Sequence, residues 1–208
     1  MESDQRSTVL LTGFGPFPGV PVNISARLAR RVAREARIIF PHVRFVETEL
    51  PTEWEQAPRL VAELHEVHRP ILALHFGVAS GSRSIRLESE AANACRNAPD
   101  ASGALPVCSR LLPDGPAVRA STLPVSDIVA GLNAKGYHSS VSNDAGGYIC
   151  NAVLYHSLGE ASEGCQAGFV HVPADLTDLQ LGEAAAAALE IIKITLESAP
   201  AETSLTSA

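Results

Sequence analysis

The sequence predicts an α/β protein, a three-layer α/β/α sandwich with a mostly parallel central sheet. Short apolar runs alternate along the chain with longer amphipathic segments, which is the pattern of strands connected by helices. One run, Ile71 to Phe76, is apolar throughout, as in a strand that helices cover on both faces. The chain has 208 residues, 46% of them hydrophobic and 19% charged, which is enough for a sizeable core. We expect one domain over residues 1–208, with a polar tail from about residue 200.

In the N-terminal half, the strand patterns stop at a glycine or a proline, and the helix patterns repeat apolar residues every three or four positions. Gly13, Pro51 and Gly77 end the first three strands. Trp54 and Val67 mark the two ends of the apolar face of the second helix. We expect strands at Thr8–Thr12, Val43–Leu50, Ile71–Phe76 and Ser84–Glu88, and helices at Ser25–Ala36 and Glu53–Val67.

The C-terminal half begins with an irregular stretch. Residues 93–116 hold four prolines and two glycines, which predicts a long loop, and loops of that length are often functional. Beyond it, Asn143–Gly147 is a turn, and Pro173 closes the last strand. We expect strands at Val118–Leu123, Ser139–Ser142 and Phe169–Val172, and helices at Val125–Ala134, Tyr148–Leu158 and Leu179–Ser198, the last of them rich in alanine.

Charge and composition narrow the class of protein. Lys and Arg total 16 against 23 Asp and Glu, a net charge of -7, so nothing in the balance indicates a nucleic-acid partner. No window approaches the roughly 20 apolar residues of a membrane-spanning helix, so we expect a cytoplasmic protein with no membrane partner. The four cysteines include no C-x-x-C pair, which argues against a zinc ribbon or a redox dithiol.

In a sheet of this kind, ligands bind beyond the C-terminal ends of the strands. Four loops qualify, those that follow Thr12, Phe76, Ser142 and Val172. The first is rich in glycine but contains neither a complete G-x-G-x-x-G nor a Gly-Lys-Ser/Thr sequence, which excludes a P-loop. Its two phenylalanines, Phe14 and Phe17, either form the walls of a small apolar pocket or anchor the loop in the core.

The third loop carries the strongest local signal. It runs from a strand through a tight turn into a helix and places Cys150 in the first turn of that helix. The free N–H groups and the positive field of a helix N-terminus stabilise a thiolate and can hold an oxyanion. A buried structural helix cysteine is the competing interpretation. Cys165 follows Gly164 in a loop that we expect to be exposed, and it has no such setting.

A cysteine nucleophile needs a base and a group that orients the base. His171 lies at the C-terminal end of a strand, which predicts that it shares an edge of the sheet with Cys150. His75 lies inside an apolar strand and is interpreted as a core histidine. Glu88 and Glu90 are both candidates for the orienting acid, and a strand would direct both to the same face, so spacing leaves the choice open.

Five segments in this order resemble the type I pyroglutamyl peptidases, also called pyrrolidone-carboxylate peptidases, over nearly the whole chain. Residues 142–151, Ser-Asn-Asp-Ala-Gly-Gly-Tyr-Ile-Cys-Asn, are similar to that family's cysteine signature, which is long and specific. Residues 169–173, Phe-Val-His-Val-Pro, are similar to its histidine segment. The segments at 12–17, 98–100 and 121–124 also match in order.

The resemblance implies a cysteine exopeptidase that removes an N-terminal pyroglutamyl residue from peptides through a thioester, with no cofactor and no metal. It implies that Cys150 is the nucleophile, His171 the base and Glu88, by its distance from Ala91 and Asn93, the orienting acid. The implied substrate-binding residues are Phe14, Phe17 and Tyr148 around the ring, with Asn23 nearby and Arg96 at the oxyanion. The resemblance is also compatible with a homo-oligomer.

The chain departs from the family's pattern around the acid. Val78 replaces a usual Gln, Arg86 a usual Ser or Thr, and Ser89 and Glu90 a basic and an aliphatic residue. We expect Glu90, a like charge close in sequence, to favour protonation of the acid. These departures motivate two alternatives: a cysteine amidase of altered substrate preference, and a catalytically weak relative that binds lactam-ended peptides.

Overall fold

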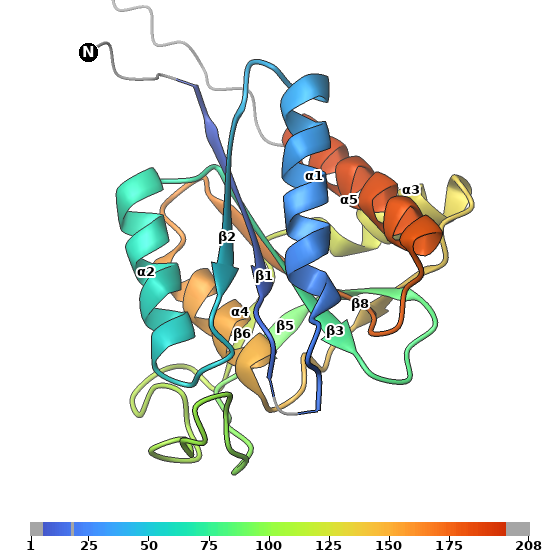
Figure 1. Ribbon diagram of the computed structural model, residues 1–208. Coiled ribbons are helices and arrows are strands. Elements are labelled where there is room, and N and C mark those ends of the chain that lie inside the picture. Colours follow the sequence, from blue (N-terminus) through green and yellow to red (C-terminus); the bar gives the residue numbers. More distant parts are fainter. Residues whose placement is uncertain (1–5, 18, 199–208) are drawn as a thin grey trace, which may run out of the picture.

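The computed structural model describes residues 6–17 and 19–198, and the expected polar tail from about residue 200 lies outside them. Within the described residues, a six-stranded sheet has the strand order β2-β1-β3-β8-β4-β7. Figure 1 shows β2 and β1 side by side in this sheet. Its strands are β1 (Thr8–Phe14), β2 (Arg44–Leu50), β3 (Leu72–Ala79), β4 (Ile85–Glu88), β7 (Ser139–Ser142) and β8 (Gln166–Pro173). The helices are α1 (Ile24–Ile39), α2 (Gln56–His68), α3 (Val125–Ala134), α4 (Ile149–Glu160) and α5 (Asp178–Ser198).

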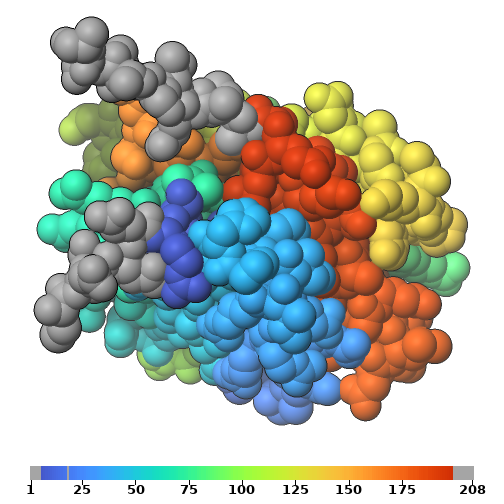
Figure 2. Space-filling view, turned by 90° about the horizontal axis from the view of Figure 1, so that it is seen from above, coloured from blue at the N-terminus to red at the C-terminus, as the bar shows by residue number. Residues whose placement is uncertain are grey.

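Helices cover both faces of the sheet, which confirms the predicted three-layer sandwich. The helices α1, α3 and α5 bury one apolar cluster with side chains of the sheet, including Leu74, Leu87 and Val170. The helices α2 and α4 bury a second cluster on the opposite face, including Phe14 and Phe169. Figure 2, which looks down on the molecule from above, shows α1 and α5 packed side by side. No helix formed by the described residues is both long and apolar enough to cross a membrane.

The sheet is mostly parallel, as predicted, but β4 and β7 run against the other strands. β4 pairs with β8 in antiparallel orientation and with β7 in parallel orientation. The end of β7 at Ser142 therefore points away from the end of β8 that carries His171. The prediction that these two loops leave the sheet at the same edge was wrong for this reason. Residues 143–148 turn back before α4 begins.

Several boundaries differ from the sequence-based expectation. The second helix begins at Gln56, so Trp54 precedes it, and Val67 is 72% exposed instead of facing the core. The strand expected at 118–123 is the shorter β6 (Val118–Ala120), which pairs with β5 (Glu90–Ala92) in a separate antiparallel sheet. Between β5 and β6 the chain forms the predicted long loop without helix or strand.

A buried polar network ties the second helical layer to the sheet and confirms that His75 is a core histidine. The side chain of His75 is fully buried, with Thr12 Oγ1 2.7 Å from its Nδ1 and Ser157 Oγ 2.8 Å from its Nε2. Ser157 Oγ also lies 2.9 Å from Nε2 of His65, on α2. Burial and the neighbouring His65 lower the pKa of His75 to about 3, so this imidazole is neutral in the folded protein.

We predict that Ser157→Ala lowers the free energy of unfolding by about 1–3 kcal/mol, because His65 and His75 each lose a buried hydrogen-bond partner. Urea denaturation followed by circular dichroism at pH 7.5 measures the difference. Ser140→Ala, at an exposed position of β7, is the control and should change the value by less than about 0.5 kcal/mol. Equal values for Ser157→Ala and wild type would contradict the structural role of the network.

Candidate active site

A cavity of about 420 Å³ lies at the C-terminal ends of β1, β3 and β8. Seven of the eight site residues expected from the sequence line it: Phe14, Phe17, Asn23, Arg96, Tyr148, Cys150 and His171. The eighth, Glu88, is fully buried behind His171. The cavity walls also include Thr52, Val78, Ser80, Arg86, Asp144 and Gly146. Residues from widely separated parts of the chain therefore share one cavity.

The antiparallel pairing of β4 with β8 directs three side chains to the same face of the sheet. Arg86 lies directly opposite His171, and Glu88 lies opposite Phe169. Residues that face each other across two strands point to the same side, as do residues two apart along one strand. Phe169 belongs to the cluster under α2 and α4, so Arg86, Glu88 and His171 point toward the layer that contains α4.

Cys150 lies in the first turn of α4, as expected from the sequence. Among the described residues, no side chain caps this helix, whose N-cap is Tyr148 in extended conformation. The first N–H groups of α4 therefore have no side-chain oxygen bound to them and are available to an anion at the cavity.

Gly77, opposite His171 in β3, makes room for the sulfur. A Cβ atom at Gly77 would lie 3.0 Å from Cys150 Sγ and 2.7 Å from the ring of Phe169. Such distances are closer than carbon atoms tolerate without displacement of the neighbours, so only glycine allows α4 to approach the sheet this closely.

His171 and Glu88 form a buried hydrogen-bonded pair. The carboxylate accepts from the ring, with 2.8 Å between His171 Nδ1 and Glu88 Oε1. Burial alone lowers the pKa of His171, but Cys150, by charge and by hydrogen bonding, and Glu88 together raise it to about 9. The imidazole is therefore a cation at neutral pH, paired with the Cys150 sulfur on one side and the carboxylate on the other.

Of the two acids that spacing left open, Glu88 is the one in contact with the histidine. Glu90 lies in β5, which pairs with β6 in the separate sheet. The strand breaks at Ser89, whose N–H donates to the carbonyl of Ser142 at 2.6 Å. The alternation of a single continuous strand, which would have directed both acids to one face, does not apply across this break.

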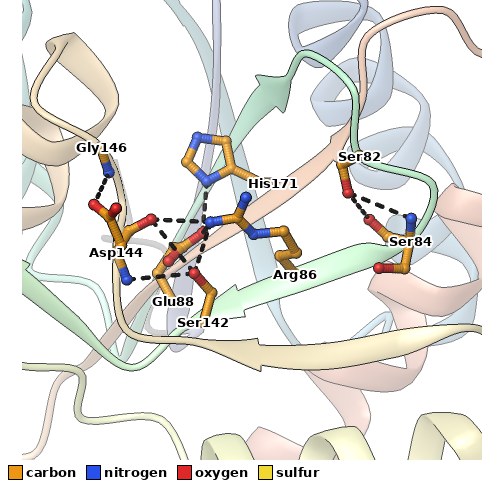
Figure 3. A network of polar contacts seen from close by, with 8 residues as sticks. All are labelled: Ser82, Ser84, Arg86, Glu88, Ser142, Asp144, Gly146 and His171. Atoms are coloured by element: carbon orange, nitrogen blue, oxygen red, sulfur yellow. Dashed lines mark hydrogen bonds and ion pairs between the residues drawn. The ribbon is translucent and has the colours of Figure 1, made fainter.

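Arg86, noted from the sequence only as a departure from the family, is part of the polar network beside Glu88 (Figure 3). Its Nη2 donates to Ser142 Oγ at 2.7 Å and to the Asp144 carbonyl at 2.9 Å, and lies 3.4 Å from Glu88 Oε1. The position two residues before Glu88 in the same strand was the sequence signal that could have identified it.

An aromatic wall closes one side of the cavity. The ring centroid of Tyr148 lies 6.1 Å from that of Phe17 and 5.2 Å from that of Trp54. The guanidinium carbon of Arg96 lies 5.5 Å from the Tyr148 ring centroid. Tyr148 Oη donates to the Pro99 carbonyl at 2.9 Å, which fixes the ring against the long loop. The contribution of Trp54 was missed because it was assigned to the apolar face of a helix.

Phe14 and Asn23 support the cavity from behind. Phe14 is only 2% exposed, with its ring centroid 6.2 Å from that of Phe169, so it anchors the loop in the core, whereas Phe17 is half-buried at the cavity. The Asn23 amide nitrogen donates to the Gly15 carbonyl at 3.1 Å, and its oxygen accepts from the N–H and hydroxyl of Ser25. The polar atoms of Asn23 therefore hold the first loop in place.

The remaining cysteines lie away from the cavity lining. Cys165 is only 7% exposed, so the expectation of an exposed thiol was wrong; its N–H donates to the Ser162 carbonyl in a turn before β8. Burial raises its pKa to about 11, which makes this thiol unreactive at neutral pH. Among the described residues, no group of three or more His, Cys, Asp or Glu side chains could hold a metal ion.

Comparison with known proteins gives a consistent assignment. The family model of pyroglutamyl peptidase matches residues 7–196. Pyrrolidone-carboxylate peptidase of Gloeobacter violaceus is 40% identical over 169 residues, which cover 79% of this chain and 80% of that protein. The enzyme of Chromobacterium violaceum is 37% identical over 171 residues, which cover 80% of this chain and 77% of that protein.

Solved structures agree with the sequence relatives. A mutant pyrrolidone carboxyl peptidase of the hyperthermophile Pyrococcus furiosus matches with a TM-score of 0.80 and 28% identity, over 91% of this chain and 98% of that one. Pyroglutamyl peptidase I of Bacillus amyloliquefaciens matches with a TM-score of 0.78 and 28% identity, over 91% of this chain and 96% of that one. With a family match over nearly the whole chain and a cysteine, a histidine and a glutamate aligned at one cavity, this chain belongs to the pyroglutamyl peptidase family of cysteine peptidases.

Proposed function

We propose that this protein hydrolyses the amide bond after an N-terminal pyroglutamyl residue of peptides, with Cys150 as nucleophile, His171 as acid and base, and Glu88 as the orienting acid. The observation that carries the proposal is the alignment of these three groups beside a partly apolar cavity of about 420 Å³. The names of the relatives, pyrrolidone-carboxylate peptidase and pyroglutamyl peptidase, support the same substrate.

In the first half of the reaction, the Cys150 thiolate attacks the scissile carbonyl carbon and forms a carbon–sulfur bond. The tetrahedral intermediate then expels the amine, which takes a proton from His171, and a thioester remains on Cys150. In the second half, His171 takes a proton from a water molecule that attacks the thioester. Pyroglutamate leaves, and the thiolate–imidazolium pair returns. Glu88 keeps the ring oriented through Nδ1 and stabilises its positive charge throughout.

The oxyanion of each tetrahedral intermediate needs donors at the cavity. The uncapped first turn of α4 supplies N–H groups beside Cys150, and the Arg96 guanidinium supplies a positive charge at the same cavity. We assign the oxyanion site to these two elements, in agreement with the role of Arg96 that the family resemblance implies.

The pyroglutamyl ring is a neutral lactam, and the cavity suits such a group. Phe17 and Tyr148 offer aromatic surface to the ring, whereas Phe14 and Asn23 act by shaping the first loop. Hydrogen bonds to the lactam N–H and C=O then supply specificity, since an acyclic analogue leaves such groups unpaired. Val78 also lines the cavity, and it is the position where an altered substrate preference would originate.

We predict that Cys150→Ala lowers the turnover of a pyroglutamyl–fluorophore amide by about 10⁵-fold or more, because the reaction loses its nucleophile. The variant should unfold at the same urea concentration as wild type to within a few tenths of a molar unit, since the substitution is small. Iodoacetamide should abolish wild-type turnover under reducing conditions.

Cys108→Ala is the matched control, because Cys108 is an exposed free thiol away from the cavity lining, and it should keep wild-type turnover. Retained activity in Cys150→Ala would refute the assignment of the nucleophile. A strong preference of the wild type for a non-lactam acyl group would instead favour an amidase of altered specificity.

We predict that Glu88→Gln lowers kcat/KM by about 10²–10⁴-fold, whereas Glu90→Gln leaves it nearly unchanged. The reason is that Glu88 contacts His171 and helps to raise its pKa to about 9. Wild-type kcat/KM should fall as the pH rises through about 9, where the imidazolium loses its proton. In Glu88→Gln this alkaline limb should move to lower pH, because the carboxylate that favours the cation is gone.

Measurement of kcat/KM over a pH series that spans both limbs of the profile, for wild type and the two variants, tests this assignment. Equal losses in Glu88→Gln and Glu90→Gln would contradict it, and so would an alkaline limb that stays in place in Glu88→Gln.

A further inference from the structure

Arg86 bridges the acid of the site and the loop that leads to the nucleophile. Its side chain is about one-third exposed, at 32%, and lines the cavity. One nitrogen, Nη2, contacts Ser142 Oγ at 2.7 Å, the Asp144 carbonyl at 2.9 Å and Glu88 Oε1 at 3.4 Å. Figure 3 shows these contacts as dashed lines from the Arg86 guanidinium to Glu88, Ser142 and Asp144.

The surroundings of Glu88 destabilise its negative charge. The carboxylate is fully buried, and its Oε2 has no hydrogen-bond partner among the described residues. Its Oε1 faces His171 Nδ1 and Arg86 Nη2. A buried carboxylate with one unsatisfied oxygen stays ionised only when nearby cations compensate for the lost hydration. His171 and Arg86 are these cations.

The charges of the cluster formed by Cys150, His171 and Glu88 balance only when Arg86 is included. In the reactive state the Cys150 thiolate and the Glu88 carboxylate carry two negative charges, and the His171 imidazolium and the Arg86 guanidinium carry two positive ones. Without Arg86 the cluster would hold one excess negative charge, and such a charge favours the binding of a proton by the cluster as a whole. Arg86 therefore offsets this excess negative charge through its ion pair with Glu88.

Other ionisable groups at the cavity do not replace Arg86. The Asp144 carboxylate accepts from the Gly146 N–H in an exposed turn, which adds negative charge. Arg96 stacks against Tyr148 on the aromatic wall. The neighbouring strand β3 brings Gly77 opposite His171, and its His75 is neutral. Within the described lining of the cavity, Arg86 is the cation that contacts the buried acid in addition to His171.

The second contact of Arg86 is with the start of the reversing loop, residues 143–148. This loop must turn the chain back from the end of β7 to the N-terminus of α4, because β7 runs against β8. Arg86 holds its beginning through Ser142 and Asp144, and the Gly146 N–H closes the turn on Asp144 Oδ1 at 2.9 Å. Gly146 has φ of +79°, a backbone conformation that favours glycine.

We propose that Arg86 is a positioning residue of the reaction, which balances the charge of the Glu88–His171 pair and anchors the reversing loop that delivers Cys150. The proposal rests on the proposed function of Cys150, His171 and Glu88. Arg86 stands where the family resemblance leads us to expect Ser or Thr. The proposal gives this arginine a role in the site.

The test compares Arg86→Met, which removes the charge and the donors, with Arg86→Lys, which keeps the charge. Ser142→Ala removes one loop contact and keeps the charge, and Arg83→Met is the matched control at an exposed arginine three residues earlier. Two quantities are measured as a function of pH: the rate at which iodoacetamide alkylates Cys150, followed by mass spectrometry of its peptide, and kcat/KM on a pyroglutamyl–fluorophore amide.

In Arg86→Met both limbs of the kcat/KM profile, and the midpoint of Cys150 alkylation, should move to higher pH by about 0.5–1 unit. Arg86→Lys and Arg83→Met should leave the limbs and the alkylation midpoint in place. Ser142→Ala should lower kcat about fivefold without moving them, because only the loop contact is lost. A residue with a merely structural role would change the amount of folded protein and leave the pH dependence unaltered.

Unmoved limbs and an unmoved alkylation midpoint in folded Arg86→Met would overturn the proposal, and so would an equal shift in Arg83→Met. If Arg86→Met fails to fold by circular dichroism, Arg86→Gln, which also removes the charge, takes its place, and unmoved limbs and midpoint in that folded variant overturn the proposal. Alkylation does not depend on the substrate. A shifted alkylation midpoint in a protein that does not hydrolyse the lactam amide would therefore refute the proposed function and support the role of Arg86.

Discussion

The antiparallel pairing of β4 with β8, inside an otherwise mostly parallel sheet, is the constraint on which the site depends. It sets Arg86 opposite His171 and brings Glu88 within 2.8 Å of the same ring. β7 also runs against β8, and residues 143–148, which include Asp144 and Gly146 of the cavity wall, connect its end to the start of α4.

Close packing then determines how Cys150 meets His171. The first turn of α4 approaches β3 at Gly77, where a methyl group would collide with Phe169 and the Cys150 sulfur. The cysteine is therefore held over the sheet by contacts that leave little freedom. Because the imidazole and the carboxylate are buried, their charges interact strongly, and with Cys150 this raises the pKa of His171 despite burial.

The long loop between β5 and β6 keeps a fixed position beside the cavity because buried polar side chains bind its backbone. Asn151, one residue after Cys150, binds the backbone of Ala92 and Ala94 through its amide. Asp100 accepts from the Trp54 N–H, and the Trp54 ring donates to the Ala98 carbonyl. A segment without helix or strand thus keeps Tyr148 and Arg96 at the cavity.

The sequence by itself determined the layers, most of the elements and the separate candidates Cys150, His171 and Phe17, because periodicity, strand ends and a helix start are local properties. The family resemblance already favoured Glu88 over Glu90, but the contact of Glu88 with His171, the burial of Cys165 and the contacts of Arg86 depend on which strands become neighbours and in which direction they run. Strand direction follows from the packing of the whole sheet. No local pattern encodes it, so only the tertiary structure could decide which charges meet.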